Sequence, residues 1–251
     1  SGHGHAPAAS KKAAPPASPV VRASGAAGGN GAAAKGELRE PALSLSITKR
    51  LSTVVPANVQ IDAPWKAIRS AREAAKAAKL DYSPSLMLAW SVVRAMTTQA
   101  GFRCIVDRDG RIFEQAPFDL GVAVALEGDR LATAVVKNAS ALDWKAFAAA
   151  YVQAVADTRA GKIVDVQAPL NLTSLGAFGI EQATPIVVPP AMATLFAGTA
   201  HEKMVNDGGV VYPQEVVTLS LTFDHRVVNG AGAAAFMHEL RQAVGNFALP
   251  A

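Results

Sequence analysis

The stretch from Val216 to Val244 constrains the fold of this chain more than any other. Its first half alternates apolar and hydroxyl-bearing residues, which is the period of a β-strand, and the apolar ones are Val217, Leu219, Leu221 and Phe223. Beyond Gly230 the apolar residues recur at helical spacing, at Ala233, Met237, Leu240 and Val244. A strand therefore leaves a sheet and a helix begins a few residues later. His225 lies at that junction, where a rigid frame presents a side chain to a cleft.

Three further helices are expected ahead of this stretch. Their apolar spacing and turn residues predict the spans Pro64–Leu80, Ser83–Gly101 and Ser140–Gly161. Asp62 is placed as the N-cap of the first helix, and Ser140 and Asp143 resemble a capping box at the start of the third. The aromatic residues on these helices are assigned to the core and to no chemistry.

Strand-like runs alternate with the helices. They are Leu120–Leu126, Leu131–Val136, Pro185–Val188, Ala193–Gly198 and Val216–Phe223. Glu127-Gly128-Asp129 joins the first two runs as a hairpin, and Asn206–Gly209 is a turn before the last. Because strands and helices are interspersed and several strand pairs look antiparallel, the sequence predicts a mixed-sheet α/β domain over roughly residues 41 to 247.

The first 40 residues differ in composition from the rest. They consist of Ala, Pro, Gly and Ser with a few basic residues, and they contain no aromatic side chain. Such a segment cannot offset its ordering entropy by burial, so residues 1–40 are interpreted as a flexible linker. His3 and His5 within it are interpreted as solvated, and no metal site is expected.

Charge and cysteine content narrow the function. The 24 basic and 20 acidic side chains give a net charge of +4, without a Lys/Arg block, which argues against nucleic-acid binding. No apolar run is long enough to span a membrane. The single cysteine, Cys104, excludes an internal disulfide and fits a reducing compartment.

Two polar residues near the strand-to-helix junction are candidates for chemistry. His225 could take a proton near neutral pH, or it could simply bond a backbone carbonyl, and its position alone favours the second interpretation. Asn229 precedes a glycine and a helical pattern, where asparagine is a preferred N-cap. The residues by themselves leave both alternatives open.

The run Asp224–Ala231, DHRVVNGA, closely resembles the DHRVxDGA signature of the dihydrolipoamide acyltransferases of 2-oxoacid dehydrogenase complexes, which shares a His-x-x-x-Asp-Gly motif with chloramphenicol acetyltransferase. Other segments are similar to the family in the same order. They are LSITKRL at Leu45–Leu51, LATAVVKNA at Leu131–Ala139, LNLTSLGAFGI at Leu170–Ile180 and IVVPP at Ile186–Pro190. This shared order favours His225 as a catalyst.

The resemblance implies transfer of an acyl group between dihydrolipoyl-lysine and coenzyme A. Only a few per cent of an ordinary thiol is ionised at neutral pH, so a base is needed, and the resemblance assigns this role to His225. Thr173 stands where the family has the serine that stabilises the oxyanion, with Ser174 as the fallback. Ser174 and Gly176 are the expected substrate-binding residues. Asn229 replaces the motif's Asp: the cap survives, but a charge partner for the imidazolium is lost.

The resemblance also implies a fold and partners. The expected fold is a two-layer mixed β-sheet with flanking helices, like chloramphenicol acetyltransferase, over residues 41–251. The expected assembly is a trimer with His225 of one subunit facing Thr173 of the next, and with a larger core left open. Expected partners are a lipoyl domain from outside this chain and the E1 and E3 components. No tightly bound cofactor is expected, because coenzyme A is a substrate.

Other interpretations stay open at the sequence level. The acyl group could be acetyl, succinyl or branched, and the motif favours acetyl in a pyruvate dehydrogenase complex. The chain could instead be a catalytically weak or inactive scaffold subunit that resembles an E3-binding protein, which Thr173 and Asn229 favour and His225 opposes. A free-standing acetyltransferase of the chloramphenicol type is a third alternative, opposed by the linker. The expected location is the cytoplasm of a bacterium, or the mitochondrial matrix or plastid stroma of a eukaryote.

Overall fold

A six-stranded mixed sheet forms the centre of the molecule. The computed structural model describes residues 45–127, 130–162 and 164–250. The strands lie in the order β1-β8-β7-β6-β4-β5 and span Pro56–Pro64 (β1), Leu120–Leu126 (β4), Arg130–Val136 (β5), Leu170–Ser174 (β6), Ala193–Asp207 (β7) and Val210–Asp224 (β8). The β4–β6 and β6–β7 pairs are parallel, and the other pairs are antiparallel. A small two-stranded sheet pairs Cys104–Val106 (β2) with Ile112–Glu114 (β3).

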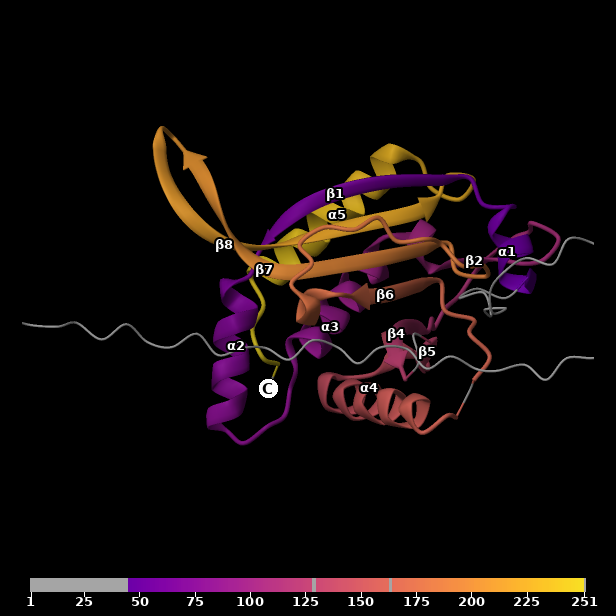
Figure 1. Cartoon of the computed structure of the whole chain (residues 1–251), viewed down its shortest axis with the longest axis horizontal. Helices are drawn as coiled ribbons and strands as arrows, with labels where there is room; N and C mark the ends of the chain where they lie inside the picture. Colours follow the sequence, from indigo (N-terminus) through magenta and orange to yellow (C-terminus); the bar gives the residue numbers. More distant parts are fainter. Residues whose placement is uncertain (1–44, 128–129, 163, 251) are drawn as a thin grey trace, which may run out of the picture.

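Four helices cover one face of the large sheet, as Figure 1 shows. They are α2 (Lys66–Ala77), α3 (Pro84–Thr98), α4 (Trp144–Arg159) and α5 (Gly230–Gly245). By contrast, α1 (Leu45–Leu51) precedes β1 and lies beyond its first residue. Short 3₁₀ helices span Ala100–Arg103 (η1), Ala139–Ala141 (η2) and Gly176–Phe178 (η3). The apolar stripes of the helices and the inward residues of every strand of the large sheet form one core. The two-layer α/β architecture that the sequence predicts is therefore confirmed.

The face of the sheet turned away from the helices is here called the outer face. On β8 it carries Thr218, Ser220 and Thr222, which are at most 3% exposed, although Val217 and Leu219 on the same strand point into the helical core. The buried hydroxyls have partners: Asn58 on β1 donates to the Ser220 and Thr222 oxygens at 3.0 Å. Because buried polar groups are costly unless they are bonded, this network explains how a strand of alternating polarity is buried on both faces.

β7 and β8 extend together beyond the rest of the sheet as a long hairpin, which projects from the molecule in Figure 1. Gly208 and Gly209 turn it with positive φ angles of 57° and 91°, a backbone region that favours glycine. A register shift between Ala197 and Ala200 marks a β-bulge at the base of the hairpin. The sequence predicts this turn but only the inner parts of both strands.

The β4–β5 hairpin and the start of the second predicted helix agree with the sequence-based expectations. The hairpin of β4 and β5 forms with Leu126 paired to Arg130, though Gly128 and Asp129 of its turn lie outside the described residues. Ser83 caps α3 by accepting from the Leu86 amide at 3.1 Å. None of the described helices is long and apolar enough to cross a membrane. The predicted linker, residues 1–40, also lies outside the described residues.

Other expectations about local structure are wrong. Asp62 does not cap a helix: it lies in β1. Its carboxylate accepts a hydrogen bond from Thr218 on β8 and forms an ion pair with Lys203 on β7. The strand predicted at Pro185–Val188 is an irregular segment. Asp143 alone caps α4, because the Ser140 hydroxyl instead accepts from the Phe118 amide at 3.1 Å. The second helix ends at Thr98, and Gly101 belongs to η1.

Candidate active site

His225 lies in the turn that leaves the end of β8, with its side chain exposed. Its backbone amide donates to the Val55 carbonyl at 2.8 Å, which ties the turn to the start of β1. Its imidazole ring lies against Phe223, with ring centroids 5.7 Å apart. The structure therefore holds the backbone of His225 on the sheet and leaves the ring accessible, as a proton-transferring group requires.

Asp224 anchors this turn through its buried carboxylate. Its carboxylate is 1% exposed and accepts from the Arg226 backbone amide at 3.1 Å and from Arg226 Nε at 2.9 Å. Burial opposes ionisation of Asp224, but the bonds from Arg226 outweigh it and lower the pKa of this carboxyl below its ordinary value. Asp224 and Arg226 thus anchor the turn by an ion pair and hydrogen bonds.

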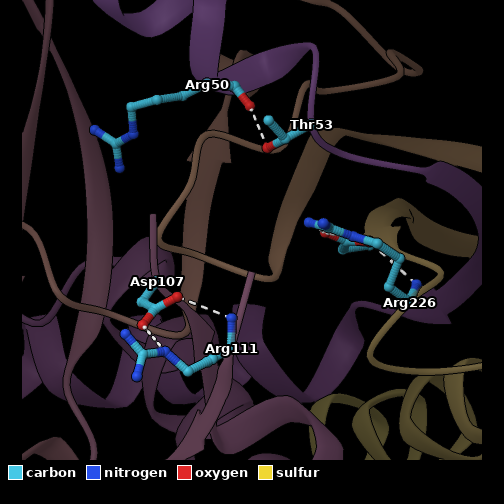
Figure 2. A network of polar contacts seen from close by, with 6 residues as sticks. Arg50, Thr53, Asp107, Arg111 and Arg226 are labelled. Carbon is cyan, nitrogen blue, oxygen red and sulfur yellow. Dashed lines mark hydrogen bonds and ion pairs between the residues drawn. The ribbon is translucent and has the colours of Figure 1, made fainter. Parts of the chain in front are cut away.

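The outer side of the Arg226 side chain faces the turn between β2 and β3. Figure 2 shows Arg226 together with Asp107 and Arg111 of that turn and with Arg50 and Thr53 at the end of α1. A side chain at Gly110 would come within 4.0 Å of Arg226 Nη1, so the two turns are near neighbours. Asp107 holds its own turn by accepting from the Arg111 amide at 2.8 Å. Arg226 is thus bonded to Asp224 and lies beside a turn that Asp107 holds.

Asn229 is the N-cap of α5, as the sequence predicts. Its φ and ψ are −92° and 174°, and its side chain accepts from the Gly232 amide at 3.2 Å. The amide oxygen satisfies one of the free N–H groups of the first helical turn. The loop therefore keeps the capped geometry that an aspartate would give at this position.

Thr173 and Ser174 end β6, and their side chains face opposite sides of the sheet. Leu170 and Leu172 point into the helical core, so Asn171 and Thr173 lie on the outer face. Ser174 instead lines a hollow of about 240 Å³ on the helical side, together with Gly176, Trp65 and Leu88. The Ser174 hydroxyl accepts from the Gly176 amide at 3.2 Å. Only one of the two hydroxyls can therefore serve a given reaction site.

The floor of this hollow depends on Gly176, an expected substrate-binding residue, and on Gly198, which sequence reasoning missed. A side chain at Gly198, in the bulge of β7, would overlap the Glu181 carbonyl, and one at Gly176 would lie 2.9 Å from the Gly198 carbonyl. The Thr199 amide donates to the Ile180 carbonyl at 2.7 Å in the same place. The close approach of two backbones explains the glycines, but no periodic signal in the sequence marks them.

A second hollow, of about 310 Å³, lies on the outer face beneath the end of α1. Leu51, Val54 and Pro56 line one side, the segment from Thr184 to Val187 lines the other, and Thr222 contributes a hydroxyl. Val54 and Pro56 flank Val55, whose carbonyl accepts a hydrogen bond from the His225 amide. An apolar hollow thus adjoins the backbone that holds His225.

His225 and Thr173 do not meet within one chain. Thr173 is level with Phe196 on β7, which is level with Ser220 on β8. His225 lies five positions further along β8 and two strands away, so strand spacing places the two residues roughly 19 Å apart. Thr173 is level with Gln60 in the middle of β1, whereas His225 lies beyond the end of β8. One chain supplies a base and a hydroxyl that could act together only across a contact between two copies.

In the described part of the chain, no group of three or more His, Cys, Asp and Glu side chains is placed to bind an ion. His201 contacts the Thr199 carbonyl on the β7–β8 hairpin, and exposed His238 bonds Gln242 on α5. His225 is therefore the histidine best placed for chemistry in this region.

A family model described as the catalytic domain of 2-oxoacid dehydrogenases acyltransferase matches residues 41–250. The dihydrolipoyllysine-residue acetyltransferase component of the acetoin cleaving system of Bacillus subtilis is 34% identical over 134 residues, which are 52% of this chain and 33% of that protein. The corresponding component of the Zymomonas mobilis pyruvate dehydrogenase complex is 28% identical over 191 residues, covering 74% and 43%. The chain thus spans less than half the length of these relatives.

The solved dihydrolipoamide acetyltransferase of Azotobacter vinelandii superposes with a TM-score of 0.72 at 25% identity, covering 80% of this chain and 85% of that one. It was solved in work on a serine, a histidine and an asparagine in its catalytic mechanism, and those residues have the same spacing as Thr173, His225 and Asn229. A chloramphenicol acetyltransferase superposes with a TM-score of 0.51 at 14% identity, which shows that the fold is shared.

Proposed function

Because this chain belongs to the 2-oxoacid dehydrogenase acyltransferase family, we propose that it transfers an acetyl group between dihydrolipoyl-lysine and coenzyme A. It does so as the core component of a 2-oxoacid dehydrogenase complex, of which the pyruvate complex is favoured. The partners proposed are a lipoyl domain and the E1 and E3 components. The reaction takes place where that complex is found, in the bacterial cytoplasm or in the mitochondrial matrix or plastid stroma.

The chemistry is divided between two residues that lie far apart on the sheet of one chain. His225 takes the proton from the thiol of coenzyme A, and the thiolate attacks the carbonyl carbon of the acetyl-lipoyl thioester. The tetrahedral intermediate carries an oxyanion, to which the Thr173 hydroxyl donates. As the intermediate collapses, the lipoyl sulfur leaves and receives the proton from the imidazolium of His225. Acetyl-coenzyme A and dihydrolipoyl-lysine result, and no other reactant is needed.

One observation carries this proposal: the separation of His225 from Thr173 within the chain. A base and an oxyanion donor roughly 19 Å apart cannot act on one carbonyl, whereas a contact between copies can bring His225 of one subunit to Thr173 of the next. We therefore propose a trimer with one site at each of its three interfaces. Ser174 and Gly176 line the hollow on the opposite, helical side of the sheet, and we assign them to substrate binding there rather than beside the Thr173 hydroxyl.

Asn229 is a positioning residue, which acts by holding the start of α5. It begins α5 four residues after His225 and holds the first helical turn. The Azotobacter protein has an asparagine at the same spacing from its histidine, which supports a functional role for Asn229. The scaffold interpretation rested in part on the missing aspartate, so it is weakened.

The test is a coupled assay with acetyl-coenzyme A and free dihydrolipoamide. We expect the parent to turn over and His225→Ala to lose about 10²- to 10⁴-fold in kcat, the usual contribution of a general base. His238→Ala is the matched control, because His238 is exposed on α5 and should leave kcat unchanged. A silent parent restored by Asn229→Asp would point to a weak core subunit, and silence in both would favour the scaffold.

A further inference from the structure

Asn171 is the nearest polar neighbour of Thr173 on the outer face along β6. The two residues are separated by one position, and their inward neighbours Leu170 and Leu172 are at most 3% exposed. Residues two apart on a strand point the same way, with Cα atoms about 6.6 Å apart. Whatever lies against Thr173 on the side where β6 begins therefore also lies against Asn171.

The Asn171 side chain fills the space above Gly121 on the adjacent strand, with which it is paired. A side chain on Gly121 would overlap Asn171 Oδ1, would lie 3.0 Å from Asn171 Cγ, and would also lie 3.2 Å from Thr133 Cγ2 on β5. Three strands thus meet at this place: β6 contributes the Asn171 amide, β4 the backbone of Gly121, and β5 the Thr133 methyl group. These groups leave no room for a side chain at Gly121.

This amide is not explained by the stability of the fold. Asn171 Oδ1 is buried and has no hydrogen-bond partner among the described residues. Leaving a buried acceptor unpaired costs about 1 to 3 kcal/mol, so an apolar residue in this place would stabilise the sheet better. A buried group left unpaired calls for an explanation, and Asn171 shares the outer face of β6 with the Thr173 hydroxyl.

The direction of the acyl chain follows from the neighbours of Thr173. Phe196, level with Thr173 on β7, is 2% exposed and already covered. Beyond Thr173 the strand ends at Ser174, whose side chain faces the helical side. Asn171 itself is only partly buried. An acyl chain attached to a carbonyl at the Thr173 hydroxyl therefore extends toward Asn171 and the spot above Gly121.

Charge further limits the acyl group. The described outer-face residues of β4, β5 and β6 are small, apolar or neutral: Gly121, Ala123, Ala125, Leu131, Thr133, Val135, Asn171 and Thr173. None of these could neutralise the carboxylate of a dicarboxylic acyl group such as succinyl, so this side of the shared site offers that group no ion pair. The amide over Gly121 also removes the space that a branched chain would need.

We propose that Asn171 determines acyl specificity by closing the acyl site beside Thr173, so that it admits acetyl and excludes longer, branched and acidic groups. This inference rests on the proposed function, because it takes the Thr173 hydroxyl as the oxyanion donor. Asn171 is assigned no role in proton transfer. Shortening its side chain opens the space above Gly121, and one additional methylene accommodated in a pocket is worth about 10-fold or more in kcat/KM.

The test measures kcat/KM with acetyl-, propionyl- and isobutyryl-coenzyme A and dihydrolipoamide for the parent, Asn171→Ala and Asn171→Ser. We expect the ratio of propionyl to acetyl kcat/KM to rise about 10-fold in Asn171→Ala and by less in Asn171→Ser. Two shortened variants are used so that one remains measurable if the other folds poorly. Leu172→Val is the matched control, because it shortens the adjacent side chain on the opposite face of the same strand.

The outcomes separate the two claims. A parent that transfers acetyl, with folded Asn171 variants whose ratio stays within about twofold of the parent, overturns the role of Asn171 and leaves the proposed function standing. A Leu172→Val ratio that rises as much as that of Asn171→Ala also overturns it, because general loosening would then explain the change. A parent without any acetyl transfer refutes the proposed function and the inference together.

Discussion

Replacing Asp224 with asparagine should loosen the turn that carries His225. The carboxylate is 1% exposed and accepts from both the backbone and the guanidinium of Arg226. An asparagine at this position would keep the shape, but its NH2 group would face the guanidinium donors of Arg226, so this hydrogen bond is lost on both sides. Removing one partner of a buried ion pair costs about 3 to 5 kcal/mol.

The expected loss for Asp224→Asn is smaller than that range. The Arg226 side chain is 34% exposed and can turn into water once its partner is gone. We therefore expect a loss of about 2 to 3 kcal/mol in the free energy of unfolding. For a folded unit of this size, about 2 to 4 °C of Tm corresponds to each kcal/mol, so Tm should fall by roughly 4 to 12 °C.

The assay is thermal unfolding by circular dichroism at pH 7, with every variant at the same protein concentration. Asp109→Asn is the matched control: it breaks a comparable pair with Arg111, but both side chains are about two-thirds exposed, so Tm should hardly change. A Tm for Asp224→Asn within about 2 °C of the parent, like that of the control, would refute the anchoring role.

The pH dependence of the same difference checks its electrostatic origin. Because the pKa of Asp224 is lowered from 3.8 in the folded state, its ionised form stabilises the fold at every pH above that ordinary value. This contribution is lost only as the pH falls through the lowered pKa. The Tm difference between the parent and Asp224→Asn should therefore stay constant from pH 7 to about 5 and shrink below about 3.8.

Three further substitutions test other parts of the structure. Gly198→Ala would drive a methyl group into the Glu181 carbonyl and should cost about 1 to 3 kcal/mol by denaturant unfolding, whereas Gly230→Ala, with open space around it, should cost nothing. Asn229→Asp keeps the cap and adds a charge at the N-terminus of α5, so Tm should be equal or slightly higher and kcat unchanged or raised; a fall of several degrees would contradict this. Phe236→Ala removes a ring stacked on Phe102 at 4.1 Å and should cost about 3 to 5 kcal/mol, and a loss below about 1 kcal/mol would show that the ring is not part of the core.

Local signals in the sequence predict the parts of the fold that depend on local physics. The alternation of β8, the helical spacing of α5 and the cap at Asn229 are all formed by residues close together in the chain. Asp62 is misassigned because an acidic residue just before a helix-forming segment favours a cap, whereas pairing with β8 holds it in an edge strand. That pairing joins residues about 150 or more positions apart, so local spacing carries no sign of it.

The site is predictable in part. His225 and Asn229 follow from the order of the motifs, and alternation along β6 separates Thr173 from Ser174 once the strand is recognised. The amide of Asn171 over Gly121 could not be foreseen, because it depends on the parallel pairing of β4 with β6. The same holds for the bulge at Gly198, where a distant loop approaches the strand.

The most direct test of a shared site mixes two inactive variants. His225→Ala and Thr173→Ala are purified separately, then denatured together in equal amounts and refolded into mixed oligomers. In a cyclic trimer each site draws His225 from one chain and Thr173 from its neighbour, so about a quarter of the sites are complete and about a quarter of the parent activity should return. No activity beyond that of the separate variants, in oligomers shown to be mixed, would contradict a site built between subunits.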